Sequence, residues 1–285
     1  MTSTMIKFRN VSKTIGNKQV LVRIRLTVSQ GSVVGIIGAK GAGKTTLLRL
    51  AAGVLYPDAG EVWVTGKKVH PGLLGGLPSG IGALIESLAF LPQLSGLRNL
   101  AMLARIRRRI NTNSIRTSML RIGLNPDNRN PVWSYSLDMR QRLGIAQAIM
   151  EEPSVLLLDE PTNGLDQEGR RLLADILEEQ TRRGASILLV SDRQADINPF
   201  CDKLYSLEEG VLLPIRQRRE HKWIIMTNSA EDLELLSLNI PSFQKIGWMN
   251  NNLAGTCMGE WETDEELFAF LALKGIYSTA IRKDH

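Results

Sequence analysis

Little in this sequence is typical of a secreted or a membrane-spanning protein. Among 285 residues there are only two cysteines, Cys201 and Cys257, and their spacing fits neither a disulfide framework nor a metal site. No apolar run approaches the roughly 18 residues that a membrane-spanning helix needs. The first residues, MTSTMIKFRNVSK, lack the apolar stretch of a secretory signal. The sequence therefore predicts a protein of a reducing compartment, without a leader or a span of its own.

Acidic residues are missing from one long stretch of a chain whose net charge is +6. Between Ser87 and Pro126 there is no Asp or Glu, whereas the arginines there are Arg98, Arg105, Arg107, Arg108, Arg109, Arg116 and Arg121. A second basic cluster, RQRREHK, covers 216–222, and an acidic one, EWETDEE, covers 260–266. Such runs are most often solvated faces. The other interpretations are contact with nucleic acid, anionic lipid or an acidic protein.

Apolar runs and helical periodicity alternate along the first three quarters of the chain. Buried strands are predicted at 32–38, 154–161 and 185–192, and an edge strand at 61–69. Helices are predicted at 44–55, at 170–180 and over most of 87–150, where SGLRN and LNPDNRNP read as loops. Strands alternating with helices imply a parallel sheet covered on both faces.

The pattern changes after about residue 215. The remaining segments predict the order βαββαβ, with capped helices in SAEDLELLS and TDEELFAFLALKG. We therefore expect two domains, 1–214 and 215–285, the second a small α+β accessory domain that contains no recognisable chemical motif.

A phosphate-binding loop is predicted at 38–46. GAKGAGKTT matches G-x-x-x-x-G-K-[ST] and lies between a predicted strand and a predicted helix, as that motif requires. Glycines let backbone N–H groups curl around phosphate oxygens, and the helix N-terminus adds its partial positive charge. Lys44 is expected to reach the β- and γ-phosphates and Thr45 to bind Mg²⁺. The whole loop is the candidate nucleotide site: Gly38, Ala39, Lys40, Gly41, Ala42, Gly43, Lys44, Thr45 and Thr46.

The segment SVLLLDEP supplies the second half of the site. Its apolar residues predict a buried strand that delivers Asp159 to the carboxyl edge of the sheet, where ligands of α/β proteins bind. Asp159 is expected to hold Mg²⁺, directly or through water. Glu160 is placed to polarise the attacking water.

With these motifs, the chain resembles the ATP-binding subunit of ABC transporters over nearly all of 1–212. GAKGAGKTT, YSLDMRQRLGIAQAI, LLLDEP and NGLD occur in the family's order. GALIESLAFLPQLSGLRNL and YSLDMRQRLGIAQAI look most like exporters for bacitracin and lantibiotic immunity. The resemblance implies a P-loop NTPase fold of the α/β class: a RecA-like parallel sheet, an antiparallel edge sheet and a helical subdomain at about 87–150. The carboxyl-terminal α+β domain is also usual in that branch.

The resemblance also implies a mechanism and partners. Two such subunits, identical or different, would pair head to tail around two ATP molecules with Mg²⁺, and hydrolysis would reset the pair. A separate transmembrane permease would hold the chain at the cytoplasmic face of the bacterial plasma membrane, with no nucleic acid expected. Peptide-antibiotic or multidrug export is a family-level expectation. The alternatives are a soluble ABC ATPase acting on nucleic acid or ribosomes, and a nucleotide-binding regulator without a transport role.

Asp138 departs from the family pattern. Ser136 keeps the serine of the signature motif, but the family has glycine at position 138, which lets the helix approach the ATP of the opposite subunit. An acid in the first helical turn gains about 0.3–1 kcal/mol. Two unit charges about 4 Å apart repel by roughly 1 kcal/mol in water and by about 4 kcal/mol at an effective dielectric of 20. We therefore predict weaker ATP-driven closure, unless a cation or an altered register intervenes.

Four other positions complete the expected site. The family's γ-phosphate-binding histidine is replaced by Asp192, whose carboxylate can only accept hydrogen bonds; the adjacent Arg193 is a candidate substitute. Glu86 stands at the position of the glutamine that senses Mg²⁺ and the attacking water, and is expected to remain functional because a carboxylate can also bind Mg²⁺. Ile15 replaces the aromatic residue stacked on adenine, and Asp166 of NGLD is expected at the subunit interface. Reduced activity is the expectation. In a heterodimer with an intact partner each site would carry only one of the two defects, Asp138 or Asp192.

Overall fold

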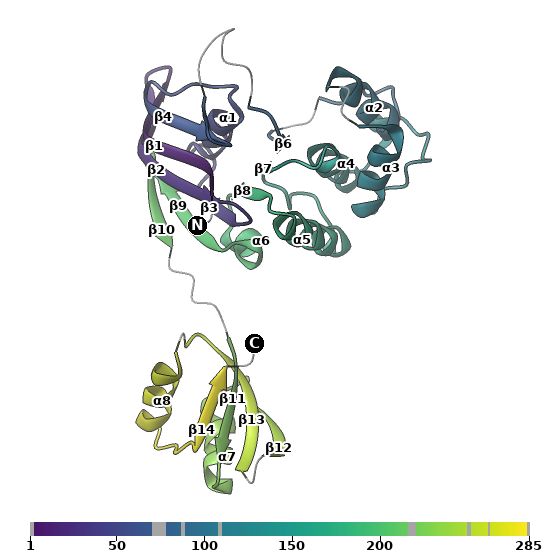
Figure 1. Cartoon of the computed structure of the whole chain (residues 1–285). Helices are drawn as coiled ribbons and strands as arrows, with labels where there is room; N and C mark the ends of the chain where they lie inside the picture. Colours follow the sequence, from purple (N-terminus) through teal and green to yellow (C-terminus); the bar gives the residue numbers. More distant parts are fainter. Residues whose placement is uncertain are drawn as a thin grey trace. The chain divides into compact units, whose positions relative to one another are not determined.

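The computed structural model describes residues 3–69, 78–86, 89–107, 110–215, 221–249, 252–261 and 263–283. The chain divides into two compact units, Met1–Ile215 and Arg216–His285 (Figure 1). Among the described residues, no helix combines the length and the apolar character needed to cross a bilayer. Arg108, Arg109 and most of the basic cluster at 216–222 lie outside the described residues.

The first unit is built on a mostly parallel sheet. The strands, in spatial order, are β10 (Val211–Ile215), β9 (Lys203–Glu208), β3 (Val33–Ile37), β8 (Ser186–Ser191), β7 (Val155–Asp159) and β6 (Ile81–Leu84). Only the β9–β10 pair is antiparallel. The three strands predicted from apolar runs, β3, β7 and β8, lie next to one another at the centre, because a strand buried on both faces needs a continuous apolar sequence. Strands β6, β9 and β10, which lie outside these three in the sheet, were not predicted.

Alternate residues of the central strands enter two different cores. Leu156 and Leu158 of β7 pack with the helices α4 (Leu137–Ile149) and α5 (Gln167–Arg182). Val155 and Leu157 pack on the opposite face, against α1 (Lys44–Ala52) and the antiparallel sheet. This two-sided burial fixes the carboxyl end of β7, and with it Asp159, at a defined place on the edge of the sheet.

An antiparallel sheet covers the face that carries α1. Its order is β2 (Lys18–Ser29), β1 (Thr4–Ile15), β4 (Ala59–Val64) and β5 (Lys67–Lys68). The prediction of one edge strand over 61–69 was wrong, because Thr65 and Gly66 both have positive φ, at 49° and 76°, and fold the segment into a hairpin. Strand β4 therefore lies between β1 and β5, and the edge is the short β5.

The helical subdomain contains α2 (Gly96–Arg107), α3 (Thr112–Arg121) and α4, which lie together to one side of the parallel sheet in Figure 1. A short 3₁₀ turn, η1 (Val132–Ser134), precedes α4. The prediction of a loop at SGLRN was wrong, since α2 begins at Gly96. The polar residues there start the helix: the buried Asn99 side chain accepts from the backbone N–H of Leu91 and donates to the Leu94 carbonyl.

Two short helical segments, α6 (Gln194–Ile197) and η2 (Asn198–Phe200), lie between β8 and β9. The second unit runs β11 (His221–Thr227), α7 (Ala230–Asn239), β12 (Gln244–Met249), β13 (Asn252–Gly259), α8 (Asp264–Leu273) and β14 (Ala280–Lys283), in the predicted order. Its antiparallel sheet has the order β12-β13-β11-β14, which is that of a ferredoxin-like fold. The sequence IYSTAIR predicts the last strand over 276–282, but β14 begins only at Ala280. Buried Ile276 belongs instead to the core, and the backbone N–H of Tyr277 bonds to Asp232.

Candidate functional site

The loop at 38–46 joins β3 to α1 and depends on its glycines. Gly41 and Gly43 have φ of 82° and 108°, conformations that side-chain-bearing residues rarely adopt. A Cβ at position 43 would also lie 2.8 Å from Cγ1 of Val20 and 3.0 Å from its carbonyl oxygen. The loop therefore has the tight curvature that lets backbone N–H groups converge on a phosphate.

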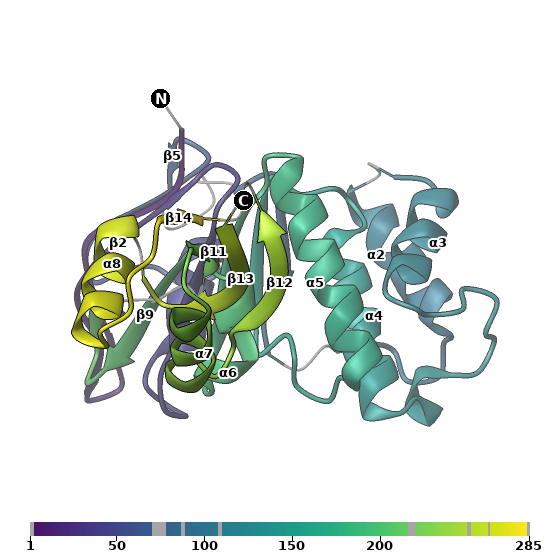
Figure 2. The same ribbon diagram turned by 90° about the horizontal axis from the view of Figure 1, so that it is seen from below.

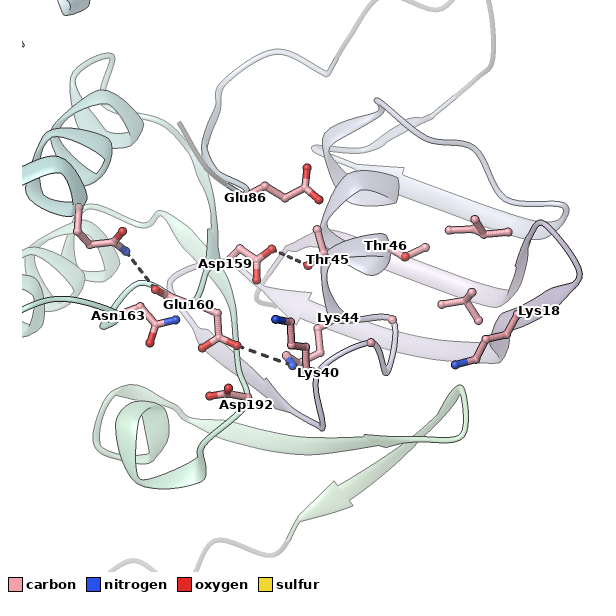
Figure 3. A pocket seen from close by; sticks show the side chains of 15 residues that line it. Lys18, Lys40, Lys44, Thr45, Thr46, Glu86, Asp159, Glu160, Asn163 and Asp192 are labelled. Carbon is pink, nitrogen blue, oxygen red and sulfur yellow. Dashed lines mark hydrogen bonds and ion pairs between the residues drawn. The ribbon is translucent and has the colours of Figure 1, made fainter. Parts of the chain in front are cut away.

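Lys44 is folded back into this loop. Its side chain is only 7% exposed, and Nζ donates to the carbonyl oxygens of Gly38 at 2.7 Å and Ala39 at 3.3 Å. Nζ also lies 3.7 Å from Oε1 of Glu160 (Figure 3). An ammonium group held in this way is a fixed positive charge at the mouth of the loop, which fits an anionic ligand.

Thr45 and Asp159 come together from α1 and the end of β7. The Thr45 hydroxyl donates to Oδ2 of Asp159 at 2.7 Å (Figure 3). Burial raises the pKa of the Asp159 carboxyl above its ordinary value; the nearby Glu86 carboxylate raises it further, while Thr45 and Lys44 act in the opposite direction. A hydroxyl beside a carboxylate is an oxygen donor set that suits Mg²⁺.

Glu160 directs its carboxylate into the same space from a strained backbone. Its φ of 47° ends β7, and the Ser191 hydroxyl at the end of β8 donates to its Oε2 at 3.0 Å. Burial raises the pKa of Glu160, and the carboxylate of Asp192 raises it further. A carboxyl group with a raised pKa next to a phosphate-binding loop is a candidate general base.

These groups surround a cavity of about 700 Å³. Its lining includes eleven residues of the predicted site: Ile15, Lys40, Gly41, Gly43, Lys44, Thr45, Thr46, Glu86, Asp159, Glu160 and Asp192. Gly38, Ala39 and Ala42 belong to the loop but do not line this cavity; Ala39 and Ala42 face a neighbouring cavity under the β9–β10 turn. Ser136, Asp138 and Asp166 are not in its lining, so one chain brings together only part of the predicted site.

Two of the unusual acidic residues have distinct surroundings within the cavity. Glu86 has a φ of 60° and forms an ion pair with Arg49 of α1. Asp192 is exposed, and its carboxylate lies close enough to Glu160 to affect the pKa of that group (Figure 3). Arg193, the candidate substitute for the histidine, is not in the lining of the cavity, and its Nε lies 3.3 Å from Oδ2 of Asp196.

Asp138 has a cation beside it. Ser136 caps α4 by accepting the backbone N–H of Met139 at 3.1 Å, and Asp138 follows in the first turn. Oδ2 of Asp138 accepts from Nε of Arg142 at 2.7 Å, and Nη2 of Arg142 donates to Asp166 at 2.7 Å. Asp166 in turn caps α5. The sequence analysis allowed for a cation that would offset the charge of Asp138. Arg142, one turn further along the same helix, is that cation.

Sequence reasoning missed several residues that shape the site: Lys18, Val20, Gln141, Asn163, Ser191 and Arg142. Gln141 donates from Nε2 to the carbonyl oxygens of Glu160 and Pro161, both at 3.1 Å. Gln141 and Asn163 lie within recognised motifs and were not weighed individually. Ser191 offered no signal, because its role depends on the pairing of β7 with β8.

Part of the basic stretch is neutralised by residues outside it. Arg116 makes two hydrogen bonds of 2.8 Å to Asp127, and Arg121 bonds to Glu179 of α5 at 2.5 Å. The acidic partners therefore come from beyond Pro126, where the run without Asp or Glu ends. Arg98 and Arg105 are exposed on α2.

A glycine-rich loop that encloses its own lysine, beside an Asp-Glu pair at the end of β7, two strands away in the same sheet, defines a P-loop nucleoside triphosphatase. The sequence profile of the ABC transporter family matches residues 21–163. The chain is similar to the uncharacterized ABC transporter ATP-binding protein YybJ of Bacillus subtilis (strain 168), at 38% identity over 208 residues, 73% of this chain and 94% of the relative. The chain therefore belongs to the ABC transporter family and is an ABC-type, nucleotide-binding ATPase.

Other comparisons confirm the predicted branch and the fold. The bacitracin transport ATP-binding protein BcrA of Enterococcus faecalis is 34% identical over 210 residues, covering 73% of this chain and 68% of BcrA. The lantibiotic transport ATP-binding protein SrtF of Streptococcus pyogenes is 29% identical over 209 residues, covering 73% and 89%. The dimeric ATP-binding cassette MJ0796, solved with ADP and Pi, superposes with a TM-score of 0.65 at 22% identity, covering 73% of this chain and 96% of that chain.

Proposed function

We propose that this chain is the ATP-binding subunit of an exporter for peptide antibiotics or similar amphipathic compounds. It would pair with a second ATP-binding subunit when ATP binds, and act on a separate permease at the cytoplasmic face of the bacterial plasma membrane. The observation that carries this proposal is the convergence of Lys44, Thr45, Asp159 and Glu160 on one cavity. The exporter class is supported by the similarity to BcrA and SrtF, which are named for bacitracin and lantibiotic transport.

The geometry supports the following roles within the site. Lys44 supplies a buried positive charge for the phosphates, and the curved loop supplies backbone N–H donors. Thr45 and Asp159 are the oxygen ligands for Mg²⁺, which when bound would neutralise phosphate charge. Glu160, which is oriented by Ser191 and whose pKa is raised above its ordinary value by burial, accepts the proton of the attacking water.

We also propose that hydrolysis is slow, chiefly because of Asp192. A carboxylate at the place of a donor cannot hydrogen-bond to a phosphate oxygen, and a hydrogen bond to a charged group contributes about 1.5–3 kcal/mol. Asp138 contributes less than an isolated charge would, since Arg142 lies 2.7 Å from its carboxylate. A heterodimer with a partner that supplies the missing donor would place one competent site opposite one slow site.

Steady-state ATP turnover and equilibrium ATP binding by the purified chain test this proposal. We expect ATP binding that is lost in Lys44→Ala, slow turnover that Glu160→Gln stops, and about 10- to 100-fold faster turnover in Asp192→His. Asp175→His, an exposed position on α5, is the matched control and should change neither quantity. Turnover that survives Glu160→Gln would refute the assignment of the base. Turnover in Asp192→His no faster than that of the unchanged chain would refute the proposed role of Asp192.

The exporter class needs a cellular measurement. In the native host, replacing the chromosomal gene with the Lys44→Ala variant should increase susceptibility to bacitracin-like or lantibiotic peptides, and the chain should copurify with a polytopic membrane protein. Unchanged susceptibility to these peptides would remove the peptide-antibiotic assignment and leave the ATPase assignment intact.

A further inference from the structure

Arg142 lies at a junction of three helix ends. Its side chain is 6% exposed, and each of its guanidinium nitrogens has a partner from a different element. Nε donates to Asp138 at the start of α4, Nη2 to Asp166 at the start of α5, and Nη1 to the carbonyl oxygen of Ile122 at the end of α3, at 2.7, 2.7 and 3.1 Å. Figures 1 and 2 both show α4 and α5 next to each other.

The surroundings of Arg142 leave space for the guanidinium. A Cβ at Gly123 would lie 2.5 Å from Nη1 of Arg142, and a Cβ at Gly169 would lie 3.2 Å from Nη2. The backbone on both sides therefore approaches the guanidinium more closely than side-chain-bearing residues would allow. A cation enclosed in this way, with directed acceptors on three elements, has little freedom to turn.

Asp138 makes a second contact at this junction, in addition to its bond with Arg142. Its Oδ1 accepts the backbone N–H of Asp166 at 3.3 Å, while its Oδ2 binds Arg142. Asp138 thus contacts α5 both directly and through Arg142. A glycine at this position could make neither contact, and it would leave Nε of a buried arginine without its acceptor, which costs free energy.

From this geometry we propose that Asp138 is a positioning residue. Together with Arg142 it fixes the signature segment at the start of α4 to the NGLD segment at the start of α5. Its carboxylate is committed to these two groups and not directed at the ATP of a second subunit. This inference rests on the proposed ATP-dependent pairing, because the signature and NGLD segments are the surfaces that such a pair would bring together.

A positioning role for Asp138 and simple charge repulsion by Asp138 predict opposite changes in ATP-dependent dimerisation when this residue is replaced. In a Glu160→Gln background, which should retain ATP because it lacks the proposed base, we expect Asp138→Asn and Asp138→Gly to weaken ATP-dependent dimerisation by about tenfold, as seen by sedimentation. ATP affinity of the monomer should stay within about twofold, because Lys44 and Thr45 are untouched. If charge repulsion dominated, both variants would tighten the dimer, more strongly at low salt, and the proposal would be overturned.

A double-mutant cycle tests the path through Arg142. Arg142→Lys keeps the charge but loses the guanidinium fork. We expect Asp138→Asn to weaken dimerisation much less in the Arg142→Lys background, whereas additive effects would contradict the proposal. Asp175→Asn is the matched control, because Asp175 pairs with Arg171 at the same i,i+4 spacing on the exposed surface of α5. It should leave dimerisation unchanged.

Hydrogen exchange provides a readout on the single subunit. Asp138→Gly should accelerate exchange of the Asp166 amide by about tenfold, since that N–H loses its acceptor, and Asp175→Asn should not. Unchanged protection of this amide would overturn the proposal. If the Glu160→Gln chain binds ATP without dimerising, pairing of two identical chains is excluded, while the exchange measurement still decides the role of Asp138.

Discussion

At the scale of single residues, Glu160 carries a charge that its surroundings disfavour. Burial and the neighbouring Asp192 raise its pKa above the ordinary value of 4.5. A carboxyl whose pKa is raised by folding gives stability that is fully present below the unfolded pKa and is lost as the pH rises through the folded pKa. We therefore expect Glu160→Gln to raise the Tm of the nucleotide-free chain at pH 8 by about 2–4 °C.

Thermal unfolding by circular dichroism between pH 8 and pH 5 measures this effect. The difference in Tm between Glu160→Gln and the unchanged chain should close as the pH falls towards 4.5, the ordinary value. Glu178→Gln removes an exposed carboxylate that pairs with Arg182 on the surface of α5, and should give no such gain. A Glu160→Gln chain that is less stable than the unchanged chain at pH 8 would contradict the expectation that the charge of Glu160 destabilises the fold.

Gly43 is the loop residue whose conformation and surroundings both exclude a side chain. Its φ is 108°, and a Cβ would meet Val20 at 2.8 Å. We expect Gly43→Ala to cost about 1–3 kcal/mol in stability and to weaken ATP binding at least about tenfold, because the loop must open to relieve the contact. Gly66→Ala has positive φ but no atom within 4 Å of the new Cβ, so it serves as the control. Unaltered ATP affinity in Gly43→Ala, measured by calorimetry, would be inconsistent with this account.

The sequence predicted the residues whose roles depend on short motifs, and it missed those whose roles depend on packing. Lys44, Thr45, Asp159 and Glu160 were placed correctly in one cavity, because a strand, a loop and a helix in order define their positions. Arg142 was missed. Its partners are 4, 20 and 24 residues away, and only the packing of α3, α4 and α5 brings them together.

At the scale of elements, the start of α4 depends on one hydroxyl group. The Ser136 side chain accepts the backbone N–H of Met139 at 3.1 Å, which satisfies one of the unpaired donors of the first turn. We expect Ser136→Ala to cost about 1 kcal/mol, which corresponds to a fall in Tm of about 2–4 °C for a unit of this size. Ser136→Thr keeps the cap and should lose much less, so equal losses in calorimetric Tm for both variants would argue against the cap.

Helices and strands were predicted well where burial requires a recognisable apolar pattern, and poorly where the conformation of a turn sets the boundary. Strands β3, β7 and β8 are buried, mostly apolar runs of five or six residues and were found. The other three were not: β6 has only four residues and includes a glycine, β9 mixes polar and apolar residues, and β10 contains Pro214 at the edge of the sheet. The segment 61–69 was predicted as one continuous strand, because its sequence does not show that Thr65 and Gly66 both adopt a positive φ and form a hairpin turn. At Asn99, polar residues that suggested a loop instead satisfy the backbone at a helix start.

At the scale of the whole chain, the two units have separate hydrophobic cores. The core of the second unit is formed by Trp223, Ile225, Leu236 and residues of β13 and α8, and none of these belongs to the cores of the first unit. The sequence predicted the order of elements in this unit, but not the strand order β12-β13-β11-β14, since pairing between distant strands leaves no local pattern.

Separate cores predict separate folding. We expect a chain ending at Ile215 to keep the ATP affinity and turnover of the whole protein within about twofold, because every lining residue of the cavity lies before that point. Residues 216–285 alone should unfold cooperatively, with Trp223 fluorescence reporting the loss of a fully buried environment. A truncated chain that binds ATP normally but turns it over much more slowly would instead assign the second unit a role in hydrolysis. The same chain failing to fold would show that the cores are not independent.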